Sequence, residues 1–393
     1  MGSISKILFF VESPFCRRDY DRFGVGLLSE NGFEVEVWDF TPFLRPEVHQ
    51  NVRILDTVSY SKHYLFLDKQ KALVAISQLE NHCMVICILG YSFNSYAVFR
   101  TLSRNKIRYG RILANASPID ENLNTAEIVK FLDKVKKITF KKFIQFLFYR
   151  IPCQYIGVRN ADFALAGGTR SVIANIRPVN LKAETEILWF HTLDYDLFLK
   201  EKHNPIQVDN TMGVFLDEYL PFHPDYLYMG VMPFTSPEEY YPILCDFFDE
   251  LEKRYGFRIL VAAHPRSQYE KHPDYFGGRS IVRGKVVELI KKSRFVIAHN
   301  STAINFAVLF KKPVIFITTN KLKQNVKGGH INKFARELGK CPINISESFT
   351  INFDEVFKVN EEAYRNFKNS YIKREGTEEL PFWQIFANRI RQL

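Results

Sequence analysis

A histidine, a proline and an arginine stand at the end of an apolar run in the second half of the chain. The run is FRILVAAHP, residues 257–265, which has the length and composition of a buried strand. Pro265 stops regular strand pairing, and His264 and Arg266 on either side of it carry donor groups for phosphate oxygens. The types and spacing of these residues therefore predict a phosphate-binding site.

A second polar cluster, Asn300, Ser301 and Thr302, stands where a predicted strand gives way to a helix over 302–312. In open α/β sheets, ligands bind at the carboxyl ends of strands, where helix N-termini also offer unpaired N–H groups to a phosphate. We expect this cluster and His264 to lie at the tips of neighbouring strands and to share one anion pocket. The alternative is that Ser301 or Thr302 only caps the helix.

Two adjacent carboxylates, Asp217 and Glu218, end the predicted strand 211–219 and are the candidates for catalytic groups. Because side chains alternate along a strand, only one of the two can face a ligand squarely. The alternative is a turn or cap motif ahead of Pro221. His223, in the loop that follows, could orient a carboxylate or bind substrate.

The elements that must position these residues follow a β-α-β pattern from the start of the chain. The apolar run 6–13, the helical pattern 18–31 and the alternating run 33–40 form the first such unit. Parallel strands need a crossover helix, so this order predicts a doubly wound parallel sheet. Further strands and helices are predicted at 69–82, 83–90, 92–107, 111–117, 161–168 and 185–196.

The second half of the chain repeats this organisation after the polar segment 201–210, which we interpret as a linker. The helix over 237–256 carries an N-cap residue, Ser236, and a closing glycine, Gly256. The remaining elements of this half of the chain are predicted at 257–265, 286–293, 294–301, 302–312 and 313–319. A chain of 393 residues suits two domains, so we predict two Rossmann-like α/β lobes with a cleft between them.

These patterns set three predicted parts of the chain. An N-terminal domain would cover 1–205, and a second domain over 206–375 would hold the predicted phosphate-binding residues. The last segment, 376–393, contains an amphipathic helix at 382–390 that would pack back on the first domain.

Weaker candidates for substrate-binding residues lie in the first domain. Ser13 and Arg17 follow the first predicted strand, and Asp120 and Glu121 follow the strand predicted at 111–117. A general base among them would need hydrogen-bond reach to an acceptor hydroxyl.

Composition excludes several classes of protein. Hydrophobic residues make up 46% and charged residues 24% of the chain, as in ordinary globular proteins. No apolar stretch is long enough to span a membrane, and the N-terminus does not read as a signal peptide, so we predict a cytoplasmic protein. The six cysteines form no metal-type pair, and no Asp-x-Asp motif stands in the chain, so we predict neither a metal nor another cofactor.

The net charge of +10 predicts an anionic partner or surface. The segment 130–143 interleaves lysines with apolar residues at helical spacing, which suits peripheral contact with anionic lipid at an inner membrane. An ordinary solvated lysine face is the equally weighted alternative. Nucleic-acid binding is not expected, because no zinc finger, RNP-like or helix-turn-helix pattern is present.

The C-terminal half of the chain resembles bacterial GT-B glycosyltransferases that use CMP-activated ulosonic acids. The sequence pattern that carries this resemblance runs from His264 and Pro265 through VVELIKKSRFVIAHNSTAINFAVLFKKPVIFI. Sialyltransferases and polysialyltransferases with an HP motif and a Ser/Thr motif belong to this group, and retaining β-Kdo transferases are the most similar in pattern. The resemblance covers about residues 211–320. It implies that His264, Ser301 and Thr302 contact the CMP phosphate and that Asp217 is a nucleophile forming a glycosyl–enzyme adduct.

The resemblance implies transfer of Kdo or a nonulosonic acid from its CMP donor to a bacterial surface glycan, free or lipid-linked. It also implies that the domain over 206–375 binds this donor and that the domain over 1–205, through the weaker candidates named above, binds the acceptor. Related sequence patterns occur in glycerophosphate polymerases and UDP-sugar 2-epimerases. The motifs therefore indicate that a nucleotide phosphate is bound more specifically than they indicate which sugar it carries. Two alternatives therefore stay open: a UDP-sugar 2-epimerase of the same fold, and a non-catalytic module that binds nucleotide or glycan.

Overall fold

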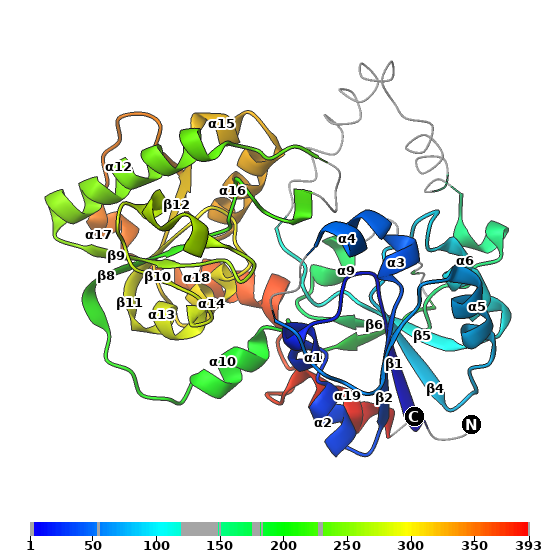
Figure 1. Cartoon of the computed structure of the whole chain (residues 1–393). Coiled ribbons are helices and arrows are strands. Elements are labelled where there is room, and N and C mark those ends of the chain that lie inside the picture. The colour runs from blue at the N-terminus through cyan, green and yellow to red at the C-terminus, as the bar shows by residue number, and fades with distance from the viewer. Residues whose placement is uncertain are drawn as a thin grey trace. The chain divides into compact units, whose positions relative to one another are not determined.

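The computed structural model describes residues 4–52, 56–118, 148, 151–174, 181, 184–226 and 231–391 (Figure 1). These residues form two compact units. Unit 1 contains the chain up to Ala116, the part that ends at Asp196, and the segment from Tyr371 onward. The main part of unit 2 is Leu197–Ser370.

Unit 1 is built on a seven-stranded parallel sheet with the strand order β3-β2-β1-β4-β5-β6-β7. Its strands are β1 Lys6–Val11, β2 Glu34–Asp39, β3 His63–Leu65, β4 Cys83–Cys87, β5 Arg108–Ile112, β6 Phe163–Ala166 and β7 Glu186–Trp189. Its helices are α1 Arg17–Arg22, α2 Val25–Glu30, α3 Thr41–Leu44, α4 Pro46–Asn51, α5 Lys69–Ser77, α6 Tyr96–Arg104, α9 Ser171–Ala174 and α19 Phe382–Ile390.

Both faces of the unit 1 sheet are buried, which explains why its central strand is apolar throughout. Phe9 of β1 packs into one cluster with residues of α2 and α19. Its neighbours Leu8 and Phe10 point to the other face and pack with residues of α5 and α6. A central parallel strand covered on both faces reads as a continuous apolar run, and KILFFV does so.

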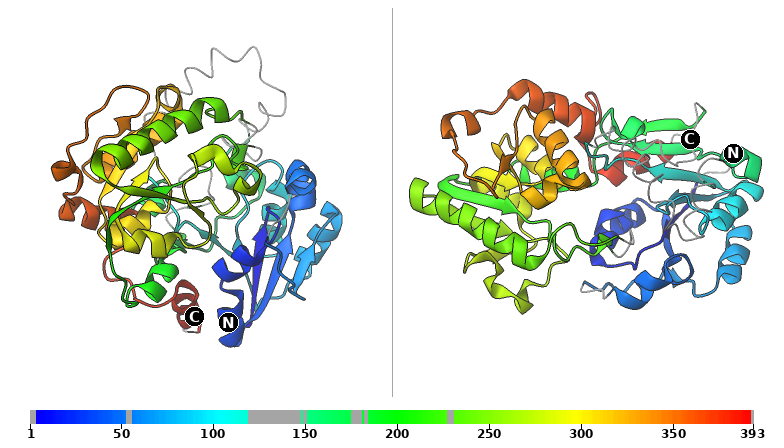
Figure 2. Two further views of the ribbon diagram at one scale, coloured as in Figure 1. Left: turned by 60° about the vertical axis from the view of Figure 1, so that its left-hand side comes forward. Right: turned by 90° about the horizontal axis from the view of Figure 1, so that it is seen from above.

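The C-terminal helix α19 belongs to unit 1, where it lies against α2 (Figures 1 and 2). Trp383 is buried, and its indole Nε1 donates to the carbonyl oxygen of Arg22 at 2.8 Å. Its ring lies over Gly24, which has a φ of 57°. A Cβ at that position would come within 2.3 Å of the ring, so the close approach requires glycine.

Unit 2 is built on a six-stranded parallel sheet with the order β10-β9-β8-β11-β12-β13. Its strands are β8 Asp209–Leu216, β9 Arg258–Ala262, β10 Ile281–Val282, β11 Ser293–Ala298, β12 Val314–Thr318 and β13 Ile343–Asn344. Its helices are α12 Pro237–Tyr255, α13 Val286–Lys292, α14 Ile304–Leu309, α15 Asn320–Lys323, α16 Val326–Glu337, α17 Phe353–Val356 and α18 Glu361–Phe367, while α10 Tyr195–Glu201 spans the change of unit.

The longest helix, α12, begins and ends at the predicted caps. The Ser236 hydroxyl accepts from the amide of Glu239 at 3.3 Å, and Gly256 closes the helix with a φ of 69°. Helix α12 packs on a sheet face with Phe215 of β8. Gly213 on β8 leaves room for the Phe295 ring, because a Cβ at position 213 would come within 2.5 Å of that ring.

The prediction of two doubly wound α/β domains is confirmed, while several bounds differ. The strand predicted at 111–117 is β5, which ends at Ile112, and the chain changes unit after Asp196, before the predicted boundary at 205. The basic segment 130–143 lies outside the described residues. No helix in the described part of the chain is both long enough and apolar enough to cross a membrane.

Candidate functional site

The candidate site lies at the carboxyl edge of the unit 2 sheet, where the strand order reverses. Counted along this unit, the order is 3-2-1-4-5-6, with β8 as strand 1 and β11 as strand 4. Open α/β sheets bind ligands outside the carboxyl ends of the strands at this reversal. Glu218 follows β8 and Asn300 follows β11, so both residues stand at the reversal.

The predicted neighbours His264 and Ser301 are not on adjacent strands. Strand β8 lies between β9, which leads to His264, and β11, which leads to Ser301. Neighbouring strands are about 4.8 Å apart, so the two tips stand about 10 Å apart. The prediction of adjacent tips was wrong because β8, which precedes both strands in the sequence, pairs with both of them.

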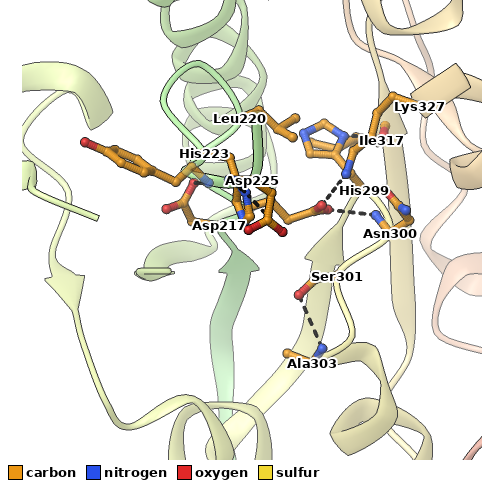
Figure 3. A network of polar contacts seen from close by, with 12 residues as sticks. Asp217, Leu220, His223, Asp225, His299, Asn300, Ser301, Ala303, Ile317 and Lys327 are labelled. Atoms are coloured by element: carbon orange, nitrogen blue, oxygen red, sulfur yellow. Dashed lines mark hydrogen bonds and ion pairs between the residues drawn. The ribbon is translucent and has the colours of Figure 1, made fainter. Parts of the chain in front are cut away.

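Glu218 bonds the loop after β11 and a lysine of α16. Its carboxylate accepts from the amide of Asn300 at 2.8 Å and forms an ion pair and hydrogen bond with Lys327 (Figure 3). Both side chains of the ion pair are largely buried, with 13% and 10% exposed. Burial alone would raise the pKa of Glu218, but the charge of Lys327 and its hydrogen bond leave that pKa below the ordinary value.

Asp217 turns to the opposite loop, the one after β9. It is 4% exposed, and its carboxylate accepts from the amides of Tyr219 at 2.9 Å and His264 at 3.2 Å. The hydroxyl of Tyr269 donates to it at 2.9 Å. Burial raises the pKa of Asp217 to about 6 although the three donors favour its charged form.

This position changes the interpretation of Asp217. A nucleophile needs an accessible oxygen directed at the sugar, whereas both oxygens of Asp217 are buried and bonded to the protein. These contacts favour a positioning role that fixes the loop of His264. Nucleophilic attack by Asp217 stays a prediction from the resemblance.

His264 is half-buried at the start of its loop and forms a hydrogen bond within it. Its Nδ1 accepts from the amide of Arg266 at 3.2 Å, so in the neutral ring the proton is on Nε2. Burial, with the nearby His223 and Arg266, lowers the pKa of His264 to about 3. The ring is therefore neutral near pH 7 and offers an Nε2–H donor, while Pro265 is exposed.

The guanidinium of Arg266 is bonded to the loop after β8. It donates to the carboxylate of Asp225 at 2.8 Å. Its Nε is buried and has no hydrogen-bond partner among the described residues. The predicted phosphate-binding cation is thus partly neutralised by Asp225, which was not among the predicted site residues.

The Asn300, Ser301 and Thr302 cluster forms a short turn before α14. The Ser301 hydroxyl accepts from the amide of Ala303 at 3.3 Å (Figure 3), and Thr302 is exposed. The assigned N-cap residue of α14 is Ala303, and the Ser301 hydroxyl accepts an amide in the turn that leads into this helix, so the capping alternative for Ser301 stays open. The side-chain oxygen of Asn300 is buried without a hydrogen-bond partner in the part of the chain that the structure describes.

His299 fixes the end of β11 but does not face a ligand. It is fully buried, and its Nδ1 donates to the carbonyl of Ile317 in β12 at 2.7 Å. Its Nε2 then accepts from the hydroxyl of Tyr240 in α12 at 2.8 Å. Burial lowers the pKa of His299 to about 4, so this is a neutral, structural histidine.

A pocket opens farther along the same edge of the sheet. Its volume is about 520 Å³, and it lies beside the start of α12 and the ends of β12 and β13. Its lining includes Thr235, Glu239, Thr319, Asn320 and Ser346. The edge that carries His264 and Asn300 therefore also has room for a group of nucleoside size.

The first unit has a comparable arrangement at its own strand reversal, between β1 and β4. Glu12, directly after β1, accepts from the amide of Gly90 at 3.1 Å and from Arg45 at 3.3 Å. Glu12 therefore bonds the loop after strand 4 of its sheet, as Glu218 does in unit 2. Glu12 was not among the predicted site residues, although it stands at the same strand end as Ser13, which was.

The acceptor-binding candidates are not brought together by the described structure. Ser13 is half-buried beside Glu12, whereas Arg17 is exposed on α1 and pairs with Asp21 at 3.2 Å. Asp120 and Glu121 lie outside the described residues. Across the described ranges, no three His, Cys, Asp or Glu side chains gather as a metal site, and metal independence stays a prediction.

Comparisons with known proteins show similarity at the level of fold. No protein-family model and no curated protein sequence matches the chain. Among solved structures, the wall teichoic acid polymerase TagF is 12% identical, with a TM-score of 0.52 over 99% of this chain and 89% of that chain. UDP-GlcNAc 2-epimerase from Methanocaldococcus jannaschii is 10% identical, with a TM-score of 0.48 over 99% of this chain and 100% of that chain.

At such identities, structural similarity indicates the fold and not the chemistry. The two parallel sheets of seven and six strands agree with the TagF match over nearly the whole chain. The chain therefore has a GT-B-like fold with two Rossmann-like domains.

Proposed function

We propose that this protein is a glycosyltransferase that uses a nucleotide-activated sugar and binds the donor phosphate at the carboxyl edge of the unit 2 sheet. One observation carries the proposal: His264 and the Asn300 loop are fixed on either side of β8, each through its main-chain amide. The neutral imidazole of His264 offers an N–H donor to phosphate oxygens at a strand reversal, where open α/β sheets bind ligands.

For the donor, we propose a CMP-activated ulosonic acid, Kdo or a nonulosonic acid, and for the acceptor a bacterial surface glycan. The sequence motifs around His264 and Ser301 support this choice. In the reaction, the bond between the anomeric carbon and the phosphate oxygen breaks, and CMP leaves. The acceptor hydroxyl oxygen bonds to that carbon and loses its proton to a base, and unit 1 would bind this acceptor.

The proposal is tested by incubating the protein separately with CMP-Kdo, CMP-sialic acid and UDP-GlcNAc, with and without a chelator. We expect CMP release from one of the CMP donors, with acceptor-dependent glycan product and no effect of the chelator. Epimerised UDP-sugar would instead establish the 2-epimerase alternative. Binding of a nucleotide without any turnover would indicate a non-catalytic module.

His264→Asn provides the link between the activity and the site. The asparagine side-chain oxygen can still accept from the amide of Arg266, while the Nε2–H donor is lost. We expect CMP release to fall at least tenfold, the scale of one lost hydrogen bond to a charged group. His272→Asn is the matched control, because His272 also precedes a proline in unit 2 but is exposed.

A further inference from the structure

Three histidine–proline pairs occur in unit 2, and two of them face each other. They are His223-Pro224, His264-Pro265 and His272-Pro273. The rings of His223 and His264 have their centroids 4.7 Å apart and are tilted by 60°. His272 instead stacks on Tyr275 at 4.7 Å.

The two facing loops have the same internal hydrogen bond. Nδ1 of His223 accepts from the amide of Asp225 at 3.2 Å, as Nδ1 of His264 accepts from the amide of Arg266 at 3.2 Å. Asp225 and Arg266, which hold the same position in their loops, are joined by the ion pair at 2.8 Å. Each ring is thus fixed by its own loop, and the two loops are fixed to each other.

These bonds determine which nitrogen carries the proton. An Nδ1 that accepts an amide hydrogen has no proton of its own, so both neutral rings carry it on Nε2. Burial lowers the pKa of both histidines, so both are neutral near pH 7. No described residue forms a hydrogen bond with either Nε2, and His223 keeps 20% of its side chain exposed.

The cations beside the pair already have anionic partners. Arg266 is bonded to Asp225, and Lys327 is bonded to Glu218. Both Nε2–H groups are therefore unused donors in this part of the site, as is the buried Nε–H of Arg266. Two imidazole rings in contact with each other can donate to different oxygens of one phosphate, since phosphate presents several acceptor oxygens.

We propose that His223 is a second phosphate-binding residue, which with His264 donates its Nε2–H to the phosphate of the nucleotide. The inference rests on the proposed function, which identifies the ligand as a nucleotide. It adds His223 to the residues that bind the phosphate. The phosphate would lie between the loops after β8 and β9. Asp217, which accepts the amide of His264, then fixes one wall of this site without touching the ligand.

The test compares nucleotides with their nucleosides, because only the former carry the phosphate. Calorimetric titration measures the affinities for CMP and for cytidine in wild type, His223→Asn, His264→Asn and the double variant, with His272→Asn as control. In His223→Asn, the asparagine oxygen can still accept from the amide of Asp225, so the loop keeps its bond. We expect CMP affinity to fall about tenfold or more and cytidine affinity to stay unchanged.

Two further results would support a shared phosphate. The double variant should lose less than the product of the two single losses, since residues on one ligand group act as a unit. His223→Gln should restore most of the affinity, because its amide N–H can stand near the position of Nε2. His272→Asn should bind CMP like wild type.

The outcomes separate this inference from the function it rests on. If His264→Asn weakens CMP binding and His223→Asn does not, the inference is wrong and the proposed donor site stands. Equal loss of CMP and cytidine binding in a folded His223→Asn would also overturn it. If wild type binds UDP in place of CMP, the CMP assignment fails and the same comparison is made with UDP and uridine. A wild type that binds no nucleotide overturns both proposals.

Discussion

Asp217 and Glu218, adjacent residues at the end of β8, accept main-chain amides from the loops on opposite sides of that strand. Asp217 bonds His264 after β9, and Glu218 bonds Asn300 after β11. The two carboxylates fix both loops of the candidate phosphate site relative to one strand.

Lys327→Met should destabilise unit 2 at neutral pH by about 3–5 kcal/mol, because it leaves the buried carboxylate of Glu218 without a cation. The pKa of Glu218 is lowered in the folded protein, so its stabilisation is present above the unfolded value near 4.5 and is lost as pH falls through the folded pKa. The difference from wild type should therefore shrink in acid. Urea unfolding followed by far-UV circular dichroism measures it.

The control for this prediction is the double variant Lys327→Met/Glu218→Gln, which buries no unpaired charge. It should be more stable than Lys327→Met alone. Equal unfolding midpoints for Lys327→Met and wild type at neutral pH would show that the ion pair does not stabilise the fold.

Asp217→Asn should change how stability depends on pH. The folded pKa of Asp217, about 6, lies above the ordinary value of 3.8, so the folded state binds the extra proton between these values. Wild-type stability should then fall as pH rises from about 4 to about 6, by roughly 2–3 kcal/mol from this group. Asparagine does not ionise, so the stability of wild type minus that of Asp217→Asn should fall by this amount over the same pH range; parallel pH curves would contradict the assigned environment.

Replacing Asp217 by alanine distinguishes a catalytic role of this residue from a positioning role. A nucleophilic Asp217 requires that Asp217→Ala abolish turnover and that a donor-derived mass increase be trapped on the protein. The buried position instead predicts that turnover falls together with CMP affinity, since the loop of His264 loses a fixed contact. Mass spectrometry after incubation with donor decides the first question, and titration of Asp217→Ala with CMP decides the second.

Trp383→Ala should destabilise unit 1 by about 3–5 kcal/mol, because it removes a buried ring and leaves a cavity over Gly24. The other tryptophans, Trp38 and Trp189, also belong to unit 1, so their fluorescence follows the unfolding of this unit. Val74→Ala, an exposed truncation on α5, should stay within about 0.5 kcal/mol of wild type. Nucleotide binding by unit 2 should survive both substitutions.

The fold could be predicted from the sequence wherever elements were long or carried caps. Helix α12 has Ser236 and Gly256 at its ends, and α19 coincides with the predicted helix over 382–390. The edge strands β3, β10 and β13 have two or three residues each, too few to show an alternating pattern. Their absence from the prediction left the strand order open.

The site was predicted in part because its residues lie at strand ends, which the sequence marks by the switch from apolar to polar. His264, Asn300 and Glu218 could be selected in this way. Lys327 could not, because it stands inside α16 with no pattern to connect it with Glu218, 109 positions away. The burial of Asp217 was missed for a related reason: its partner Tyr269 comes from a separate short helical turn.

The repeated use of a glutamate on a main-chain amide, at Glu12 and Glu218, has an evolutionary consequence. The peptide N–H that Glu218 accepts is present whatever side chain stands at position 300, whereas at Gly90 a Cβ would come within 3.2 Å of the Glu12 carboxylate. Recognition loops anchored in this manner can exchange their amino acids, and with them the sugar or base they select, while the backbone underneath keeps its course.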